Sequence, residues 1–306
     1  MARRRRPLPW LGLLLAVFIT GGGLGAGLLI SRRAALPPAA PARNPLPKTP
    51  HLYPPTPSPK TAAPSSPGGG TGAAREEKQT VPTPVRPSAQ VAVIFDDAGG
   101  SLQDLADIMA IGRPVTVAVL PGLRYSKEVA LRARAGSVEV LMHLPLEAVN
   151  SGKRLGPGAI STDMTDEEIA AIVSADLAAV PGASGVNNHM GSRATADARV
   201  MRSVLGVVKD HGLIFVDSVT SSRSVAGSLA DEMGIPTARR HVFLDNENEP
   251  EAIRTQLRSL ISIARRRGSA VGIGHATRLT PRILAQMLPE FDRLGIELVP
   301  VSTLVR

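Results

Sequence analysis

The chain has 306 residues and no cysteine, so disulfide scaffolds, cysteine nucleophiles and thiolate metal sites are excluded. Its formal net charge of +9 is concentrated in residues 1–90, which hold 12 basic and two acidic residues, whereas residues 91–306 hold 23 basic and 24 acidic residues. Because the later part is not basic and only 3% of all residues are aromatic, we expect no nucleic-acid partner.

Residues 1–33 have the pattern of a membrane anchor. Four arginines at positions 3–6 precede an apolar run from about Pro9 to Ile30, and two more arginines follow it. About 20 apolar residues are enough for a helix to cross a bilayer, and the flank with more positive charge stays in the cytoplasm. We therefore expect one transmembrane helix with a cytoplasmic N-terminus. Cleavage by a peptidase at the small residues near positions 26–35 is the alternative.

Residues 34–89 have a different composition. They contain 15 of the chain's 27 prolines, together with many Ser, Thr and Ala residues and three consecutive glycines at positions 68–70. Such a segment cannot bury enough apolar surface to offset the entropy lost on ordering. We expect a disordered, extended linker between the anchor and a folded domain.

The sequence becomes periodic over residues 90–306. Short apolar, β-branched runs typical of strands occur at 91–95, 115–120, 138–142, 184–188, 213–216, 241–244, 270–274 and 297–301. Amphipathic stretches typical of helices lie between most of them, for example at 102–111, 167–179, 196–210, 250–267 and 281–293. This alternation predicts an α/β domain of parallel strands, either an open doubly wound sheet or a barrel. Seven or eight units in about 216 residues, with no G-x-G-x-x-G after the first strand, favour a small (β/α) barrel.

In either architecture the functional site forms at the carboxyl ends of the strands. The first strand ends in Asp96 and Asp97, and two adjacent carboxylates can divide the work of holding a cation and accepting a proton from water. Solvation of a loop or capping of the next helix is the alternative, although Ser101 is better placed for a cap.

Two histidines follow later strands. His143 ends the third strand, and on an extended segment Glu147 would share its face. The fourth strand ends in Asn187, Asn188 and His189, which are unusually polar residues for a buried strand end and need partners such as a metal or ligand. The alternatives are a satisfied core histidine at 143 and a polar loop around 189.

The later strand ends add further candidates. Asp217 and Asp245 follow the fifth and sixth strands, where each can orient a histidine, bind a substrate hydroxyl or cap a helix. His275 lies between small residues at the end of the seventh strand and can act as a general acid or as a structural donor. We assign the remaining histidines to the linker or to structural positions; they are His51, His211 and His241.

Three of the five histidines in residues 90–306 therefore fall at strand ends, together with several aspartates. Two histidines and a carboxylate with open positions form a typical hydrolytic site for a divalent metal, which we expect to be Zn²⁺.

The strand ends also resemble a known family. The sequences Val-Ile-Phe-Asp-Asp at 93–97, Val-Leu-Met-His at 140–143, Gly-Val-Asn-Asn-His-Met-Gly-Ser at 185–192, Phe-Val-Asp-Ser at 215–218 and Gly-Ile-Gly-His at 272–275 are similar to the divergent polysaccharide deacetylases. This family is a branch of the NodB-like carbohydrate esterases. The resemblance covers about residues 90–306 and implies a distorted (β/α) barrel and metal-dependent removal of acetyl groups from N-acetylated sugars.

The resemblance also implies roles for single residues. By position, Asp96 matches the general base, Asp97 a metal ligand, His143 the first histidine of the metal motif and His275 the acid that protonates the leaving amine. Glu147 stands where the second metal histidine would be, and we transfer that ligand role to His189.

The family's Arg-Pro-Pro-Tyr-Gly segment is absent and is replaced by the region around His189 and Arg193. We assign Glu147, Asn188, Arg193, Asp217 and Asp245 to substrate contacts or to the support of the ligands.

We therefore expect a zinc-dependent deacetylase of an envelope glycan or peptidoglycan, held by a single-pass anchor in a bacterial inner membrane with its domain in the periplasm. The alternatives are a catalytically inactive envelope module that binds a glycan or a cell-wall protein, and a metal-dependent hydrolase of another amide or ester.

Overall fold

A computed structural model describes residues 89–150 and 158–306. The predicted membrane anchor and all of the predicted linker except residue 89 lie outside these residues. Within the described ranges, no helix is both long enough and apolar enough to cross a membrane.

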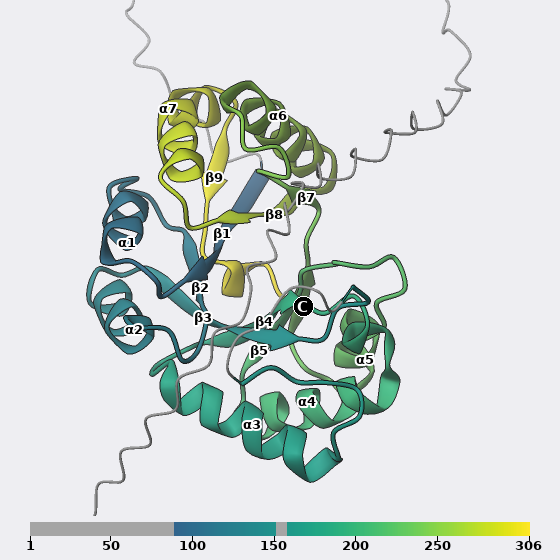
Figure 1. Ribbon diagram of the computed structural model, residues 1–306. Helices are drawn as coiled ribbons and strands as arrows, with labels where there is room; N and C mark the ends of the chain where they lie inside the picture. Colours follow the sequence, from purple (N-terminus) through teal and green to yellow (C-terminus); the bar gives the residue numbers. More distant parts are fainter. Residues whose placement is uncertain (1–88, 151–157) are drawn as a thin grey trace, which may run out of the picture. The chain divides into compact units, whose positions relative to one another are not determined.

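The described chain is built on one sheet of parallel strands, as the alternation of the sequence predicts (Figure 1). The strands follow the order β6-β5-β4-β3-β2-β1-β8-β7, and β9 also pairs with the beginning of β1. No pairing between β6 and β7 is present among the described residues, so the curled sheet is a half-barrel rather than a closed ring. The strands are β1 (Ala89–Ala98), β2 (Thr116–Val119), β3 (Glu139–Leu146), β4 (Gly185–Met190), β5 (Ile214–Asp217), β6 (Thr237–Arg239), β7 (Val242–Phe243), β8 (Ser269–His275) and β9 (Ile296–Leu298).

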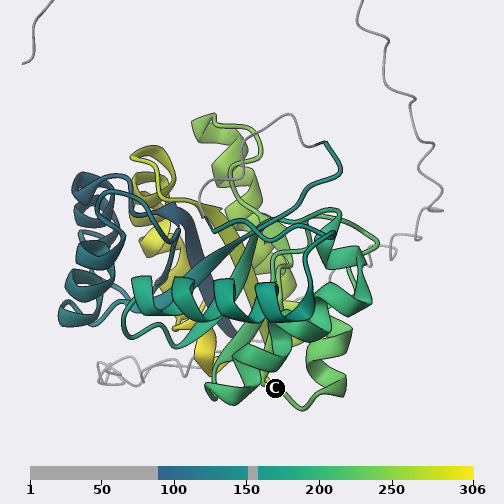
Figure 2. The ribbon, with the colours of Figure 1, turned by 60° about the horizontal axis from the view of Figure 1, so that its bottom comes forward.

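In the described residues, seven α-helices lie around the outer face of this sheet; α3 and α4 pack side by side, and α3 crosses the front of the view in Figure 2. They are α1 (Leu102–Met109), α2 (Ser126–Ala135), α3 (Asp166–Ala179), α4 (Ala198–Asp210), α5 (Ala226–Glu232), α6 (Pro250–Arg267) and α7 (Leu279–Arg293). In α4, Asp197 caps the N-terminus, and Val200, Val204 and Val208 recur every four residues and are buried. This spacing places one apolar stripe against the sheet.

Two differences from the predicted elements affect the site. The third strand continues to Leu146, so His143 lies inside a strand rather than just beyond one. A short strand at Thr237–Arg239, which the sequence analysis did not separate from its surroundings, ends the sheet. Three residues are too few to show a periodic pattern.

The side chains along each strand alternate between the two faces of the sheet, and the inner face leads to the pocket. Side chains such as Val93 and Phe95 pack toward the helices, whereas Ala92 and Ile94 belong to a smaller apolar cluster inside the curl. Because strand side chains alternate with a period of two, Asp96 continues the inner row of β1 at its carboxyl end.

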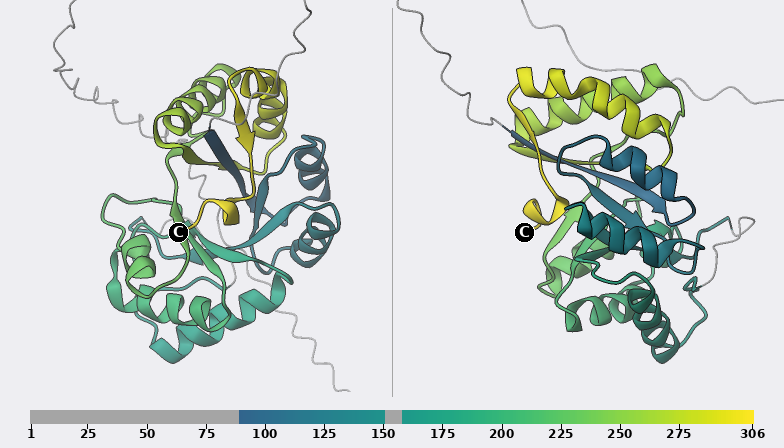
Figure 3. Two further views of the ribbon diagram at one scale, coloured as in Figure 1. Left: turned by 180° about the vertical axis from the view of Figure 1, so that it is seen from behind. Right: turned by 90° about the vertical axis from the view of Figure 1, so that its left-hand side faces the viewer.

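The C-terminal segment crosses the opposite end of the half-barrel, as the views in Figure 3 show. The backbone NH of Val301 donates to Oγ1 of Thr116 at 3.1 Å, and Val301 is fully buried in the inner cluster. Further on, Arg306 and Thr237 exchange backbone hydrogen bonds of 3.0 and 3.2 Å. This segment therefore links the middle of the sheet with its edge at β6.

Candidate functional site

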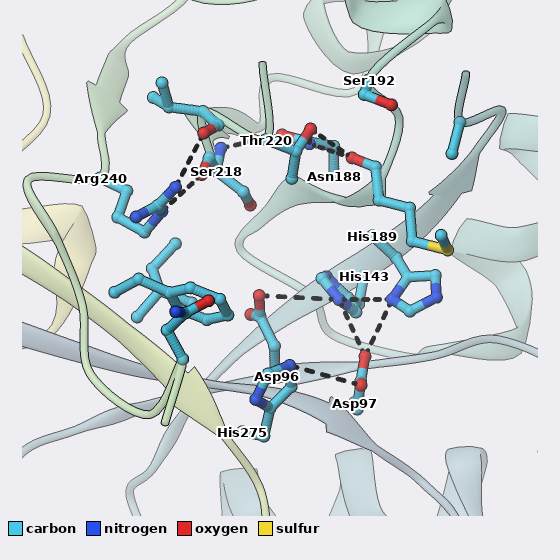
Figure 4. A pocket seen from close by; sticks show the side chains of 16 residues that line it. Asp96, Asp97, His143, Asn188, His189, Ser192, Ser218, Thr220, Arg240 and His275 are labelled. Atoms are coloured by element: carbon cyan, nitrogen blue, oxygen red, sulfur yellow. Dashed lines mark hydrogen bonds and ion pairs between the residues drawn. The ribbon is translucent and has the colours of Figure 1, made fainter. Parts of the chain in front are cut away.

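A cavity of about 440 Å³ opens at the carboxyl ends of the strands. Its floor carries two aspartates and three histidines, which come from β1, β3, β4 and β8 (Figure 4). These are Asp96, Asp97, His143, His189 and His275. The structure therefore brings together all the residues for which the sequence predicts catalytic or metal-binding roles. A volume of this size falls in the range of small-molecule sites.

A β-bulge on β1 places two consecutive carboxylates in one pocket. The pairing of β1 with β2 shifts between Phe95 and Ala98, and Asp97 has a left-handed backbone with φ of 63°. In a regular strand, adjacent side chains point to opposite faces, so Asp97 would face the helices. The bulge turns it into the pocket beside Asp96, in agreement with the common position of bulges next to functional sites.

Three ligand atoms converge at the floor of the pocket. Oδ1 of Asp97 lies 2.9 Å from Nδ1 of His189 and 3.2 Å from Nε2 of His143, and the two nitrogens are 3.2 Å apart. Oδ1 is buried but accepts no well-aligned hydrogen bond from the described residues. The three atoms thus form a nearly equilateral triangle of electron-pair donors.

This triangle fits a divalent metal ion. An ion about 2.0–2.2 Å from each N or O donor requires donors about 2.9–3.5 Å apart in tetrahedral or octahedral geometry. The three observed separations lie within this range. Two imidazoles and one carboxylate are also the ligand types that zinc prefers in hydrolytic sites.

Asn187 fixes the orientation of His143. Its Oδ1 lies 2.8 Å from Nδ1 of His143, so this nitrogen donates a proton to the amide and Nε2 keeps its lone pair for a metal. Its Nδ2 donates to Oδ1 of Asp96 at 2.8 Å. His143 and Asn187 are register partners on β3 and β4, which explains the short contact.

The two adjacent aspartates have opposite electrostatic character. Burial raises the pKa of Asp96 above its ordinary value, although His143 and Asn187 oppose this effect. Burial also acts to raise the pKa of Asp97, but interactions with His143 and His189 outweigh it and lower the pKa well below its ordinary value. Asp97 is therefore a permanent anion suited to hold a cation, whereas Asp96 is the better proton acceptor.

His275 forms a dyad with Asp245. Nδ1 of His275 lies 3.0 Å from Oδ1 of Asp245, while Oδ2 accepts from the His275 backbone NH at 2.7 Å and from Thr280 at 2.6 Å. The interaction with Asp245 raises the pKa of His275 to about 8. An imidazolium with this pKa is protonated at neutral pH and can give its proton to a leaving group.

Asn188 shapes the pocket wall. Its Oδ1 accepts from the backbone NH of Ser218 at 2.8 Å, and its Nδ2 donates to the carbonyl of Met190 at 2.8 Å. It thereby joins the loops that follow β4 and β5. Asn188 also lines the cavity, and its role in substrate contact or in support of the ligands stays a prediction.

Glu147 does not join the ligand triangle, and we correct the expectation that it shares the face of His143. Oε2 accepts from the backbone NH and the hydroxyl of Thr162 at 2.7 and 2.8 Å, and Oε1 accepts from Arg193 at 3.0 Å. The backbone NH of Glu147 binds the carbonyl of Ile160. Because β3 ends at Leu146, the alternation of the strand no longer applies to the next residue. Glu147 and Arg193 hold neighbouring loops outside the cavity.

Asp217 also lies outside the cavity. Val216 belongs to the inner cluster, so the next residue of β5 points toward the helices. Oδ1 of Asp217 accepts from the backbone NH of Val219 at 2.8 Å, and Oδ2 accepts from Ser224 at 2.9 Å. Its role is to hold the loop after β5.

The sequence analysis missed several residues of the pocket. Asn187 was noted as needing partners but was given no role, although it connects His143 to Asp96. Arg240 and Phe243 line the cavity from the segment between β6 and the end of β7. The alternation of polar Asn187 with buried Val186 was a usable signal, whereas nothing separates Arg240 from an ordinary surface arginine in the sequence.

Comparisons with known proteins agree with this architecture. An uncharacterised protein of Haemophilus influenzae is 34% identical over 218 residues, which are 71% of this chain and 77% of that protein. The uncharacterised protein YibQ of Escherichia coli is also 34% identical over 218 residues, covering 71% of this chain and 68% of its own. The crystal structure of an uncharacterised protein from Agrobacterium tumefaciens is 26% identical with a TM-score of 0.68, and the match covers 73% of this chain and 91% of that one.

A family model described as divergent polysaccharide deacetylase matches residues 93–305. The match begins at the fifth residue of β1 and ends in the C-terminal segment, so it includes the two aspartates and three histidines of the cavity floor. The chain belongs to the divergent polysaccharide deacetylase family.

Proposed function

We propose that this protein is a metal-dependent hydrolase that removes acetyl groups from an N-acetylated sugar. The observation that carries the proposal is the triangle of Asp97, His143 and His189, with a proton acceptor, Asp96, and a proton donor, His275, beside it. Membership of a deacetylase family supports the choice of reaction.

The three converging atoms of the triangle would hold the ion, which we propose to be Zn²⁺. When bound there, a divalent ion supplies Lewis-acid polarisation of the substrate's carbonyl oxygen. The hydrogen bond from Nδ1 of His143 to Asn187 keeps Nε2 of that ring available as a ligand.

Asp96 and His275 would move the protons. In the reaction, water adds to the acetamide carbon, the C–N bond breaks, and acetate and a free amine leave. Asp96, with a raised pKa, accepts the proton of the attacking water. His275, whose Nε2 lies 3.8 Å from Oδ2 of Asp97, gives its proton to the departing nitrogen and regains one from solvent.

The substrate we propose is a glycan of the bacterial envelope, such as peptidoglycan. The support is the order of segments in the sequence, where a basic and apolar stretch and a proline-rich stretch precede the domain. Such an order would hold the domain in the periplasm on a single-pass anchor. Protease digestion of the folded domain in spheroplasts, but not in intact cells, is the expected result. Protection in both would contradict this location.

The test of the activity combines metal analysis with product detection. We expect about one zinc per full-length chain, its loss in His189→Ala and Asp97→Ala, and acetate release from N-acetylated glycans by the parent protein. Glu147→Gln is the matched control, because Glu147 lies outside the ligand triangle. It should keep both the metal and the activity. Absence of metal from the parent would overturn the proposed site.

The alternative is a catalytically inactive envelope module that binds a glycan or a cell-wall protein. The substitution of Glu147 for a histidine first suggested it, but His189 supplies a second imidazole in the triangle. Asp96 and the His275–Asp245 dyad also have no role in a pure binding site. Bound zinc without acetate release from any glycan would favour the inactive module.

A further inference from the structure

Arg240 is a cationic residue in a pocket whose floor is acidic. It lies on the side of the cavity away from His189, as Figure 4 shows, and it is half-buried. No other arginine or lysine among the described residues lines this cavity. The mechanism proposed above does not use it.

The guanidinium of Arg240 is held in a fixed position. Nε donates to the carbonyl of Ser218 at 2.6 Å, and Nη2 donates to the carbonyl of Val219 at 2.7 Å. Cζ lies 4.9 Å from the centroid of the Phe243 ring. A guanidinium has five N–H donors, so both donors on Nη1 and one on Nη2 have no partner in the described part of the chain.

Arg240 also forms no direct ion pair with a carboxylate of the described residues. Arg193, Arg199 and Arg202 each form an ion pair with a carboxylate, whereas Arg240 forms none within residues 89–150 and 158–306. Burial lowers the pKa of Arg240, because it removes water around the charge, although the nearby charges of Asp96 and Asp217 oppose this effect. The guanidinium nevertheless stays protonated at every physiological pH. A partly desolvated charge that has free donors and no direct ion-pair partner is stabilised when an anion binds to it.

We propose that Arg240 binds a carboxylate of the substrate, so that the pocket selects an acidic N-acetylated sugar over a neutral one. This inference rests on the proposed function, because it places the acetamido group at the ligand triangle. Phe243 lies between the two ends of the pocket, with its ring 5.4 Å from that of His275 and in contact with Arg240. The charge of Arg240 offsets the repulsion between an acidic sugar and the two aspartates of β1.

A positioning role for Arg240 predicts a different outcome. Val219 is a β-branched residue with φ of 47°, a strained conformation, and its carbonyl accepts from Arg240. If Arg240 served only to hold this turn, its replacement would weaken acidic and neutral ligands alike. Selectivity between two ligands that differ in one charge therefore separates the two roles.

The experiment compares N-acetylmuramic acid with its methyl ester, in which one added methyl group removes the charge of the lactyl carboxylate. Dissociation constants are measured by calorimetry on the full-length zinc-loaded protein. We expect the acid to bind at least about tenfold more tightly than the ester, as for a hydrogen bond to a charged group. In Arg240→Gln the acid should bind only as well as the ester, and the affinity for the ester should be unchanged. Arg202→Gln, an exposed arginine of α4, is the control and should behave as the parent.

Each other outcome overturns the inference. Equal affinity of the parent for acid and ester would show that the pocket does not discriminate between a charged and a neutral sugar. The deacetylase proposal would stand. A preference for the acid that survives in Arg240→Gln would mean that the metal holds the carboxylate. An equal loss of affinity for both ligands in Arg240→Gln would show that Arg240 only positions the turn at Val219. Failure of the parent to bind either sugar would overturn the inference, whereas the proposed function is decided by acetate release from N-acetylated glycans.

Discussion

His143 and Asn187 lie side by side on neighbouring parallel strands, with Nδ1 of the imidazole 2.8 Å from Oδ1 of the amide. The same amide donates to Asp96, so one side chain connects a proposed metal ligand with the proposed general base. An amide side chain can accept from one neighbour through its oxygen and donate to the other through its nitrogen. The orientation of His143 and the hydrogen bonding of Asp96 are therefore coupled.

Replacement of Asn187 should weaken metal binding without removing a ligand. In Asn187→Leu, Nδ1 of His143 loses its acceptor, so the ring is no longer held in the tautomer that leaves Nε2 free. We expect zinc affinity to fall about 10- to 100-fold, as measured by competition with a chelator. Asn246→Ala is the control, because Asn246 lines the cavity but forms no hydrogen bond with a ligand or with Asp96. Equal zinc affinities in Asn187→Leu and the parent would contradict this role.

The His275–Asp245 dyad should set the alkaline limit of activity. His275 must be protonated to act as an acid, and its pKa is raised to about 8 by Asp245. Activity should therefore decline above about pH 8 in the parent and at lower pH in Asp245→Asn, because the neutral amide no longer stabilises the imidazolium. The measurement is kcat/KM for acetate release as a function of pH. Asp217→Asn changes an aspartate that has no contact with His275. In this variant kcat/KM should decline at the same pH as in the parent.

Removal of the acid should reduce the rate but not the metal content. In His275→Gln we expect kcat for acetate release to fall about 10²- to 10⁴-fold, the usual contribution of general acid–base catalysis. Zinc content should remain that of the parent, since His275 is not part of the ligand triangle. Loss of zinc in this variant would show that His275 is a ligand instead.

Asp176 on α3 should make stability depend on pH. It is buried, its Oδ2 has no hydrogen-bond partner among the described residues, and burial raises its pKa from 3.8 to about 7. Between about pH 4 and pH 7 the folded protein keeps a proton on Asp176 that the unfolded chain has lost. The contribution of Asp176 to the free energy of unfolding is therefore greatest below about pH 4 and is lost as the pH rises through 7. Asp176→Asn cannot titrate, so its stability relative to the parent should increase between pH 5 and pH 8. Urea unfolding at both pH values measures this.

The matched control for Asp176 is Asp210→Asn, which changes an exposed aspartate at the end of α4. It should shift stability by the same small amount at both pH values. The stability of Asp176→Asn relative to the parent could instead change with pH no more than that of this control. The Asp176 carboxyl would then have to be stabilised in its charged form.

The C-terminal segment should stabilise the open edge of the half-barrel. Deletion of Arg306 removes the two backbone hydrogen bonds that it exchanges with Thr237. At about 0.5–1.5 kcal/mol each, their loss should lower the free energy of unfolding by about 1–3 kcal/mol. Arg306→Ala keeps both backbone bonds and should unfold like the parent. Urea denaturation compares them, and an equal loss in both variants would assign the effect to the arginine side chain.

Much of the site could be predicted from the order of residues along the chain. Alternation of strands and helices implies a parallel sheet, and the carboxyl ends of parallel strands meet at one edge. Asp96, His143, His189 and His275 lie at or near such ends, and the structure brings them into one cavity. The polar end of the fourth predicted strand also pointed to His189, which the structure places beside Asp97 and His143.

The tertiary structure alone decided which neighbouring side chains share this cavity. A bulge turns Asp97 inward, the end of β3 directs Glu147 to Thr162, and the inner position of Val216 leaves Asp217 facing the helices. Arg240 reaches the pocket because it lies in the segment that joins the two edges of the sheet, β6 and β7, and binds the carbonyls of Ser218 and Val219. Residue type and spacing determine which strands form, but the direction of a side chain at a strand end depends on register, bulges and the place where the strand stops. Those features arise from contacts between segments far apart in the sequence.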